Sequence, residues 1–201
     1  SKYGIGTFGK EAFQFVDFLQ SGGQKYWQIL PLGPTGFGNS PYQTFSSFAI
    51  NPLFIDPELL YSDGLLSTND YSQLSLESSI SFIDYGKVYE NHFTLLKKAY
   101  KNFKNFDQNQ FLEFISQNES WLSDYSKFMA IKNHFGNISS QDWPQDILFR
   151  ETESLNILVN KLSDDINFFK FLQFKAYSQW KKLKSYANSK SIKIIGDLPI
   201  Y

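Results

Sequence analysis

The chain of 201 residues contains no cysteine and only two histidines. The absence of cysteine excludes a disulfide-stapled fold, a zinc site with thiolate ligands and catalysis by a thiol. The two histidines, His92 and His134, fall inside segments with helical periodicity, where a histidine usually packs against the helix or lies on its surface. We therefore expect neither a metal site nor histidine-assisted hydrolysis by a serine.

The sequence also lacks an excess of charge of one sign and any long apolar run. The formal net charge is −1 and the sequence pI is about 6.1, so a surface that tracks nucleic-acid phosphates is not expected. No apolar run approaches the ~20 residues that span a bilayer, and no signal-peptide pattern opens the chain. These features predict a cytoplasmic protein without nucleic-acid or membrane partners, and they leave its oligomeric state open.

Aromatic side chains, in contrast, are abundant. The chain contains 21 Phe and 12 Tyr, and aromatic residues make up 18% of it. Apolar and aromatic residues recur at helical spacing over residues 85–103, 121–135 and 169–187, with Asp84 and Asp164 near the starts of the first and third segments. This periodicity is typical of helices that bury one face, so most of these rings are expected in the core.

Two short apolar runs predict parallel strands. The first, "YWQIL" at residues 26–30, follows a predicted helix that either Thr7 or Gly9 can cap and that Gly22-Gly23 ends. The second, "IKIIG" at residues 192–196, is rich in β-branched residues, as in a strand buried on both faces. Such a sheet requires further strands to cover its edges. We therefore expect the chain to be a fragment of a longer protein.

The loop "GPTGFGNSPYQTFSSFAINP", residues 33–52, follows the first predicted strand. Its Gly-Pro, Gly-x-Gly and Asn-Ser-Pro sequences are typical of turns, while its glycine spacing fits neither a phosphate-binding loop nor a nucleophile elbow. Turns do not account for Tyr42, Gln43, Thr44 and Asn51. A flat ring beside groups that both donate and accept hydrogen bonds is suited to binding sugars.

One carboxylate follows a predicted strand. Asp197 occupies the kind of position where barrel enzymes hold active residues, although it equally fits a simple turn. Asp56 and Asp63 lie in loop-like sequence, and Asp17 lies on a predicted helix surface. Cleavage of a glycosidic bond requires two carboxylates, and no second one follows a strand here. The chain is therefore not expected to hold a complete catalytic pair.

Four segments carry a family resemblance: "SKYGIGTFGKEAF", "WQILPLGPTGFGNSPYQTFSSFAINP", "WLSDYSKFMAIKNHFG" and "QWKKLKSYANSKSIKIIGDLPIY". Together they resemble the N-terminal part of the 4-α-glucanotransferase (amylomaltase or disproportionating enzyme) family. The resemblance implies an α/β fold, namely the incomplete N-terminal part of a (β/α)8 barrel with a large, mainly helical insertion between its second and third strands. Residues 1–55 would be the first barrel segment, 56–190 the insertion, and 191–201 the third strand and the start of its loop.

The resemblance also implies an activity and a set of site residues. Family members transfer α-1,4-glucan segments between maltooligosaccharides by a retaining double displacement, with no metal or organic cofactor. Their catalytic carboxylates belong to later strands, so the resemblance places no catalytic residue in this chain and implies that the fragment is inactive. Tyr42 and Asp197 match substrate-binding positions, and Ser40, Pro41 and Gln43 match the rim around them.

One position departs from the family pattern, and two other functions remain open. Phe37 stands where some relatives have a tyrosine at a secondary glucan-binding site; a phenyl ring still stacks on a sugar but lacks the hydroxyl. A non-catalytic module that binds glucans or other proteins through aromatic helices would also fit the composition. A plain α-glucan hydrolase would differ from a transferase only in using water as the acceptor.

Overall fold

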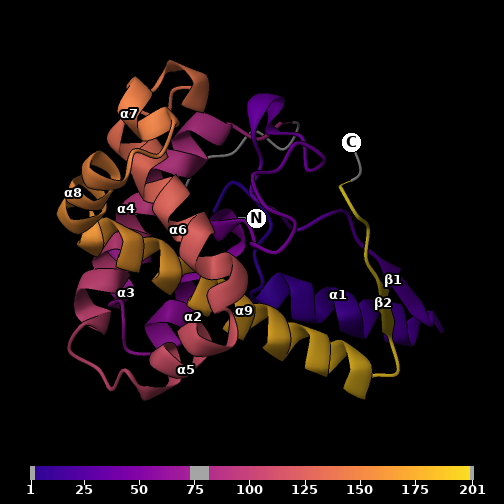
Figure 1. Ribbon diagram of the computed structural model, residues 1–201. Coiled ribbons are helices and arrows are strands. Elements are labelled where there is room, and N and C mark those ends of the chain that lie inside the picture. The colour runs from indigo at the N-terminus through magenta and orange to yellow at the C-terminus, as the bar shows by residue number, and fades with distance from the viewer. Residues whose placement is uncertain (1–2, 73–81, 200–201) are drawn as a thin grey trace. The chain divides into compact units, whose positions relative to one another are not determined.

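The computed structural model describes residues 3–72 and 82–199 (Figure 1). The chain divides into two compact units, one formed by Ser1–Gln108 with Lys175–Tyr201 and the other by Asn109–Phe174. This division follows contacts within the chain, whereas the boundaries predicted at residues 55 and 190 separate barrel from insertion. Those boundaries remain a prediction.

The described chain is mostly helical with a small sheet. The first unit contains α1 (Lys10–Ser21), β1 (Tyr26–Gln28), the 3-10 turns η1 (Phe37–Asn39) and η2 (Pro52–Phe54), α2 (Pro57–Ser62), α3 (Thr68–Ser72), α4 (Tyr85–Phe103) and β2 (Lys193–Ile195). The second contains α5 (Asn109–Gln117), α6 (Glu119–His134), η3 (Ser140–Asp142), α7 (Gln145–Leu148) and α8 (Thr152–Lys161). The long helix α9 (Ser163–Ser189) begins in the second unit and ends in the first. No helix in residues 3–72 and 82–199 combines the length and apolar character needed to cross a membrane.

Helix α1 has the boundaries that the sequence predicts. Gly9 is its N-cap and Gly22 its C-cap, and Val16 on its inner face is fully buried. The helix ends because Gly23 adopts a φ of +69°, a left-handed conformation in which glycine has no Cβ penalty. Tyr186 of α9 packs against Phe13 of α1, with 5.0 Å between ring centroids, so the two helices lie side by side (Figure 1).

Helices α4, α6 and α9 confirm the three predicted aromatic stripes. Helix α4 begins after Asp84, whose carboxylate accepts the Lys87 N–H at 3.1 Å as an N-cap. Helix α6 ends before Gly136, which has a φ of +70°. Asp164 lies in the first turn of α9, near its start as predicted. The residues buried along these stripes include Val88, Leu96, Tyr100, Phe103, Leu122, Tyr125, Phe169, Leu172, Ala176, Leu183 and Ala187.

Both histidines have the packing or surface role that their helical positions predict. His92 is buried on α4, where its Nε2 lies 3.1 Å from the Ile55 carbonyl oxygen and its ring meets Tyr3 edge-on. Burial lowers the pKa of His92, which favours the neutral ring. His134 is exposed at the end of α6. Within the described ranges, His, Asp and Glu side chains form no group of three or more suited to a metal ion.

The two predicted strands pair as parallel neighbours. Tyr26 of β1 is in register with Lys193 of β2, and the ladder continues beyond β1 where the Ile29 N–H donates to the Ile195 carbonyl oxygen at 3.0 Å. The carboxyl ends of parallel strands lie at the same edge of a sheet. The segments that follow β1 and β2 therefore leave from a common edge (Figure 1).

The prediction that the second strand, β2, is buried on both faces is wrong for the described chain, and β1 is exposed on one face as well. Tyr26 is 56% exposed and Ile195 46% exposed, whereas Trp27 and Ile194 are partly buried. Successive side chains of a strand point to opposite faces. One face packs on α1, where the Phe15 ring lies 5.3 Å from the Trp27 ring, and the other stays open in the part of the chain that the structure describes.

Asp56, which lies in loop-like sequence, is a buried structural residue. Its side chain caps α2 by accepting the backbone N–H groups of Glu58 and Leu59, and it also accepts the Thr7 hydroxyl at 2.6 Å. Gln179 of α9 holds the Asp56 backbone, accepting its N–H at 2.7 Å and donating to its carbonyl at 3.2 Å. Asp56 thus joins the N-terminal segment, α2 and α9 within the first unit.

Asp63 also has a structural role, because it ends α2 and pairs with a lysine. Its carboxylate lies 2.9 Å from the Lys175 Nζ, and the Lys175 side chain is only 10% exposed. Asp17, in contrast, lies on the surface of α1 as predicted, where it accepts the Tyr186 hydroxyl at 2.6 Å and pairs with Lys190 at 3.2 Å.

Candidate functional site

The loop that follows β1 is closed by its own backbone. Thr35 and Thr44 form an isolated antiparallel bridge. The Gly36 N–H donates to the Gln43 carbonyl at 2.6 Å, and the Gln43 N–H donates to the Ser40 carbonyl at 3.2 Å. Residues 35–44 therefore form a compact loop whose two arms are held together.

Two glycines explain why the loop can close so tightly. A Cβ atom on Gly36 would lie 2.9 Å from the Gln43 carbonyl oxygen, closer than real Cβ atoms approach backbone. Gly38 has a φ of +69°, which favours glycine. The interpretation of this stretch as turns is therefore supported for its first half, where glycine permits both the close approach and the reversal.

The loop brings Tyr42 to Asp197, a residue 155 positions later in the chain. The Tyr42 hydroxyl donates to Asp197 Oδ2 at 2.7 Å, and the Leu198 N–H donates to Asp197 Oδ1 at 2.8 Å. The hydrogen bond to Asp197 is the main cause that raises the pKa of Tyr42 above its ordinary value. Tyr42 is 37% exposed, so its ring lies at the surface above the edge where the strands end.

The other predicted rim residues lie in the same loop and partly support it. Ser40 Oγ accepts the Tyr42 N–H at 3.3 Å, Pro41 is half-buried, and the Gln43 side chain is exposed. These three residues flank the pair formed by Tyr42 and Asp197. The side chain of Phe37 lies outside what the structure describes, and the secondary glucan site stays a prediction.

Two polar residues that we considered for sugar binding have structural partners instead. Thr44 Oγ1 donates to the Ser46 carbonyl at 3.0 Å, inside the loop. Asn51 is buried and caps η2 by accepting the Leu53 N–H at 3.0 Å. Their short side chains favour local backbone contacts, which explains their presence without a ligand.

Two exposed rings lie in the same loop as Tyr42, between residues 33 and 52. Phe45 is 41% exposed and Phe48 is 62% exposed. Tyr177 of α9 donates its hydroxyl to the Phe48 carbonyl at 2.6 Å and so supports this part of the loop. Both phenylalanines lie in the loop of residues 33–52, and their aromatic side chains are the sequence feature that could have identified them. The sequence around Tyr177 offers no such feature, because its hydrogen-bond partner lies 129 residues away.

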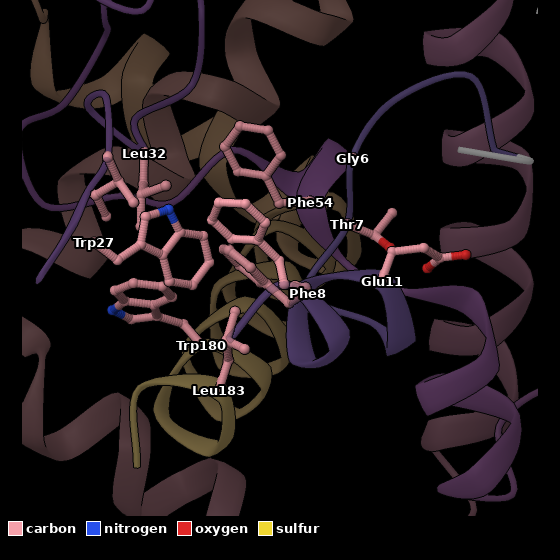
Figure 2. A pocket seen from close by; sticks show the side chains of 12 residues that line it. Gly6, Thr7, Phe8, Glu11, Trp27, Leu32, Phe54, Trp180 and Leu183 are labelled. Carbon is pink, nitrogen blue, oxygen red and sulfur yellow. The ribbon is translucent and has the colours of Figure 1, made fainter. Parts of the chain in front are cut away.

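A cavity of about 320 Å³ lies elsewhere in the first unit, among α1, β1 and α9 (Figure 2). Figure 2 shows the Trp27 and Trp180 indoles beside Phe8 and Phe54, while the Glu11 carboxylate points away from these rings. The Thr7 hydroxyl at its border already bonds Asp56. The cavity thus offers apolar surface with few free polar groups, and none of the predicted site residues lines it. Its lining residues are Gly6, Thr7, Phe8, Glu11, Ala12, Phe15, Trp27, Ile29, Leu32, Phe54, Trp180 and Leu183.

The candidate carboxylates from the sequence, Asp56, Asp63 and Asp197, do not form a catalytic pair. Asp56 and Asp63 cap the two ends of α2; Asp56 is buried and hydrogen-bonded, and Asp63 pairs with Lys175. Asp197 alone stands at the carboxyl end of a strand, beside the exposed Tyr42. The arrangement can hold a ligand against a ring and a carboxylate, but general acid and nucleophile are not both supplied by these residues.

A parallel strand pair with a ring and a carboxylate at its carboxyl edge resembles the arrangement in α/β proteins that bind ligands at that edge. Comparison with known proteins specifies the class further. The family model described as 4-alpha-glucanotransferase matches residues 1–201. The chain belongs to the 4-alpha-glucanotransferase family.

Individual relatives agree with this assignment. The 4-alpha-glucanotransferase of Clostridium butyricum is 50% identical over 200 residues, covering 100% of this chain and 41% of that protein. That of Streptococcus pneumoniae serotype 4 is 44% identical over 201 residues, covering 99% of this chain and 40% of that protein. The solved amylomaltase of Streptococcus agalactiae in complex with acarbose has a TM-score of 0.95 and 46% identity, covering 100% of this chain and 41% of that one. The chain therefore spans about 40% of the length of the relatives it matches.

Proposed function

We propose that this chain is the N-terminal portion of a 4-α-glucanotransferase that transfers α-1,4-glucan segments between maltooligosaccharides. The observation that carries the proposal is the family match over the whole chain, together with an exposed Tyr42 bonded to Asp197 at the carboxyl edge of parallel strands. The amylomaltase of Streptococcus agalactiae, a close structural neighbour, was solved with acarbose bound. A sugar-like ligand at a ring-lined edge fits the chemistry of this loop.

The proposed architecture is the first part of a (β/α)8 barrel. In it β1 is the second barrel strand, β2 is the third, and residues 56–190 form the insertion between them. The parallel register of Tyr26 with Lys193 supports adjacent barrel strands, and the helices from α2 to α9 supply the helical insertion. The open face of the strands, with Tyr26 and Ile195 exposed, would line the interior of the proposed barrel, and the remaining strands would pair with the outer edges of β1 and β2.

The proposed binding wall consists of Tyr42 and Asp197, with Ser40, Pro41 and Gln43 at its rim. The Tyr42 ring offers a flat face to the C–H side of a glucose unit, and its hydroxyl and the Asp197 carboxylate offer polar contacts. The loop is held by its own backbone bonds, so the wall is formed before a ligand arrives, which reduces the entropy lost on binding.

The proposed mechanism is a retaining double displacement, and its catalytic carboxylates lie outside this chain. Such a mechanism requires a nucleophilic carboxylate and an acid/base carboxylate about 5–5.5 Å apart. Asp197 faces the Tyr42 hydroxyl rather than a second carboxylate. We therefore expect the 201-residue chain alone to be inactive, with no metal or organic cofactor required by the complete enzyme.

Disproportionation of maltotriose tests this function. A full-length enzyme that carries this segment should convert two maltotriose molecules to glucose and maltopentaose. Glucose is measured with an enzymatic assay, and the other products are identified by mass spectrometry. The isolated chain should release no glucose. Equal amounts of glucose and maltose, with 18O taken up from labelled water, would show a hydrolase instead. Glucose release by the isolated chain would contradict the placement of the catalytic carboxylates.

The same samples distinguish a non-catalytic module. A module of that kind would bind maltooligosaccharides as the isolated chain, with a cooperative melting transition, while the full-length protein would leave maltotriose unchanged. Retention of configuration is read by proton NMR of the transfer products, where a retaining enzyme gives new glycosidic bonds with α anomeric protons.

A further inference from the structure

The bond between Tyr42 and Asp197 joins the segments that follow two neighbouring parallel strands. Asp197 stands two residues after β2, whereas Tyr42 returns to the sheet edge at the end of a closed loop. Both oxygens of the Asp197 carboxylate are engaged, Oδ2 by the Tyr42 hydroxyl at 2.7 Å and Oδ1 by the Leu198 N–H at 2.8 Å. The carboxylate is therefore held in a fixed orientation and is aimed at the phenol.

The direction of the hydrogen bond determines what Tyr42 can offer to a ligand. An ionised carboxylate is an acceptor only, so the shared proton belongs to the Tyr42 hydroxyl. The hydroxyl has one proton, and once this is donated to Asp197 its oxygen can only accept. The same bond raises the pKa of Tyr42, so the hydroxyl stays protonated across neutral pH.

We propose that Asp197 is a positioning residue that acts through Tyr42, fixing its ring and leaving its hydroxyl oxygen as the acceptor of a hydrogen bond from a sugar hydroxyl. This inference rests on the proposed function and deepens it, because it gives Tyr42 and Asp197 different roles within the proposed binding wall. Tyr42 contacts the sugar, whereas Asp197 orients Tyr42. Ser40 assists by accepting the Tyr42 N–H at 3.3 Å.

The first unit contains a matched pair for comparison. The Tyr186 hydroxyl donates to Asp17 Oδ1 at 2.6 Å, also at the surface, but these residues lie on α9 and α1 rather than at the ends of the strands. In both pairs a tyrosine hydroxyl donates to an aspartate, but Asp17 also pairs with Lys190 and the positions of the pairs differ. Tyr186→Phe and Asp17→Asn therefore report what the loss of a surface tyrosine–aspartate bond does away from the site.

A double-mutant cycle in the full-length enzyme tests the positioning role. Tyr42→Phe, Asp197→Asn and the double variant are compared with wild type by kcat/KM for maltotriose disproportionation. Each single variant should lose about 10- to 100-fold, the range for a hydrogen bond to a charged group. The kcat/KM of the double variant should be no more than about twofold below that of the less active single variant, because both changes remove the same interaction. Tyr186→Phe and Asp17→Asn should stay within about twofold of wild type, as expected for changes at a distance from the reacting groups.

A second readout does not depend on activity. With 13Cζ-labelled tyrosine, NMR titration gives the pKa of Tyr42, which should fall toward its ordinary value in Asp197→Asn while the Tyr186 signal stays unchanged. An unchanged Tyr42 pKa would overturn the proposal, as would losses that multiply in the double variant, since Asp197 would then act on the substrate independently. If wild type shows no transfer at all, the proposed function fails, but the titration still decides whether Asp197 holds Tyr42.

Discussion

Replacing Gln179 by methionine should destabilise the first unit strongly, although the side-chain volume hardly changes. Gln179 is 1% exposed and makes two hydrogen bonds to the backbone of Asp56, at 2.7 and 3.2 Å. Asp56 is itself 2% exposed, so water does not reach its backbone N–H, which the variant leaves without a partner. The Asp56 carbonyl keeps one bond, because it also accepts the Leu60 N–H at 3.2 Å. Methionine has nearly the same length, which keeps the cavity contribution small.

The expected loss follows from the unsatisfied Asp56 N–H. A buried backbone N–H without a partner costs about 1–3 kcal/mol, so the variant should lower the free energy of unfolding by about that amount. A central value of about 2 kcal/mol corresponds to a fall in Tm of about 4–8 °C for a chain of this size. Such a loss is a large fraction of the stability of a typical protein, about 5–15 kcal/mol.

Urea unfolding followed by tryptophan fluorescence measures this change, because Trp180 follows Gln179 on the same helix. The matched control is Gln14→Met on the exposed side of α1, which should change the free energy of unfolding by less than about 0.5 kcal/mol. A loss below about 1 kcal/mol in Gln179→Met would refute the reasoning, because the Asp56 backbone would then find other partners at little cost.

Three further substitutions test the packing of the first unit. In Asp56→Asn the difference in unfolding free energy between variant and wild type should shift in favour of the variant as the pH rises from 4 to 7. Burial raises the folded-state pKa of Asp56, so the stability of wild type falls as the pH rises through that raised pKa; a difference that does not change with pH in urea unfolding would contradict this. Asp63→Asn should cost about 1–2 kcal/mol by leaving the poorly exposed Lys175 ammonium without its carboxylate, and Asp63→Asn with Lys175→Met should recover part of this loss in the same assay. Gly9→Ala should cost about 1–3 kcal/mol because its Cβ would lie 1.9 Å from Asp56 Oδ2, and an unchanged melting temperature would show that the N-terminal segment moves freely.

The elements that sequence predicts well have local signals. Gly9 and Gly22 bound α1, Asp84 starts α4 and Gly136 follows α6, each through backbone conformation or a cap within a few residues. The two strands were recognisable from their apolar runs, and their parallel pairing is confirmed. Local chemistry therefore fixes where the elements begin and end.

The features that sequence does not predict depend on residues far apart in the chain. Asp56 lies in loop-like sequence, and its burial follows from Gln179, 123 positions away. The predicted burial of the strand at residues 192–196 is too high for the described chain. Its β-branched residues indicate a preference for a sheet, but they do not specify which elements cover the two faces of that sheet. The local sequence of Asp197 fits a turn as well as a site, and its hydrogen bond with Tyr42, 155 residues away, is visible only in the folded chain.

The most direct test of the central claim is the turnover of Tyr42→Ala in a full-length enzyme that carries this segment. The variant removes the ring and the hydroxyl from an exposed loop position, so kcat/KM for maltotriose disproportionation should fall about 100-fold or more while Tm changes by less than about 2 °C. Unchanged kinetics would contradict the assignment of Tyr42 to the glucan-binding wall. A fall in Tm large enough to explain the lost activity would show that the residue supports the fold instead.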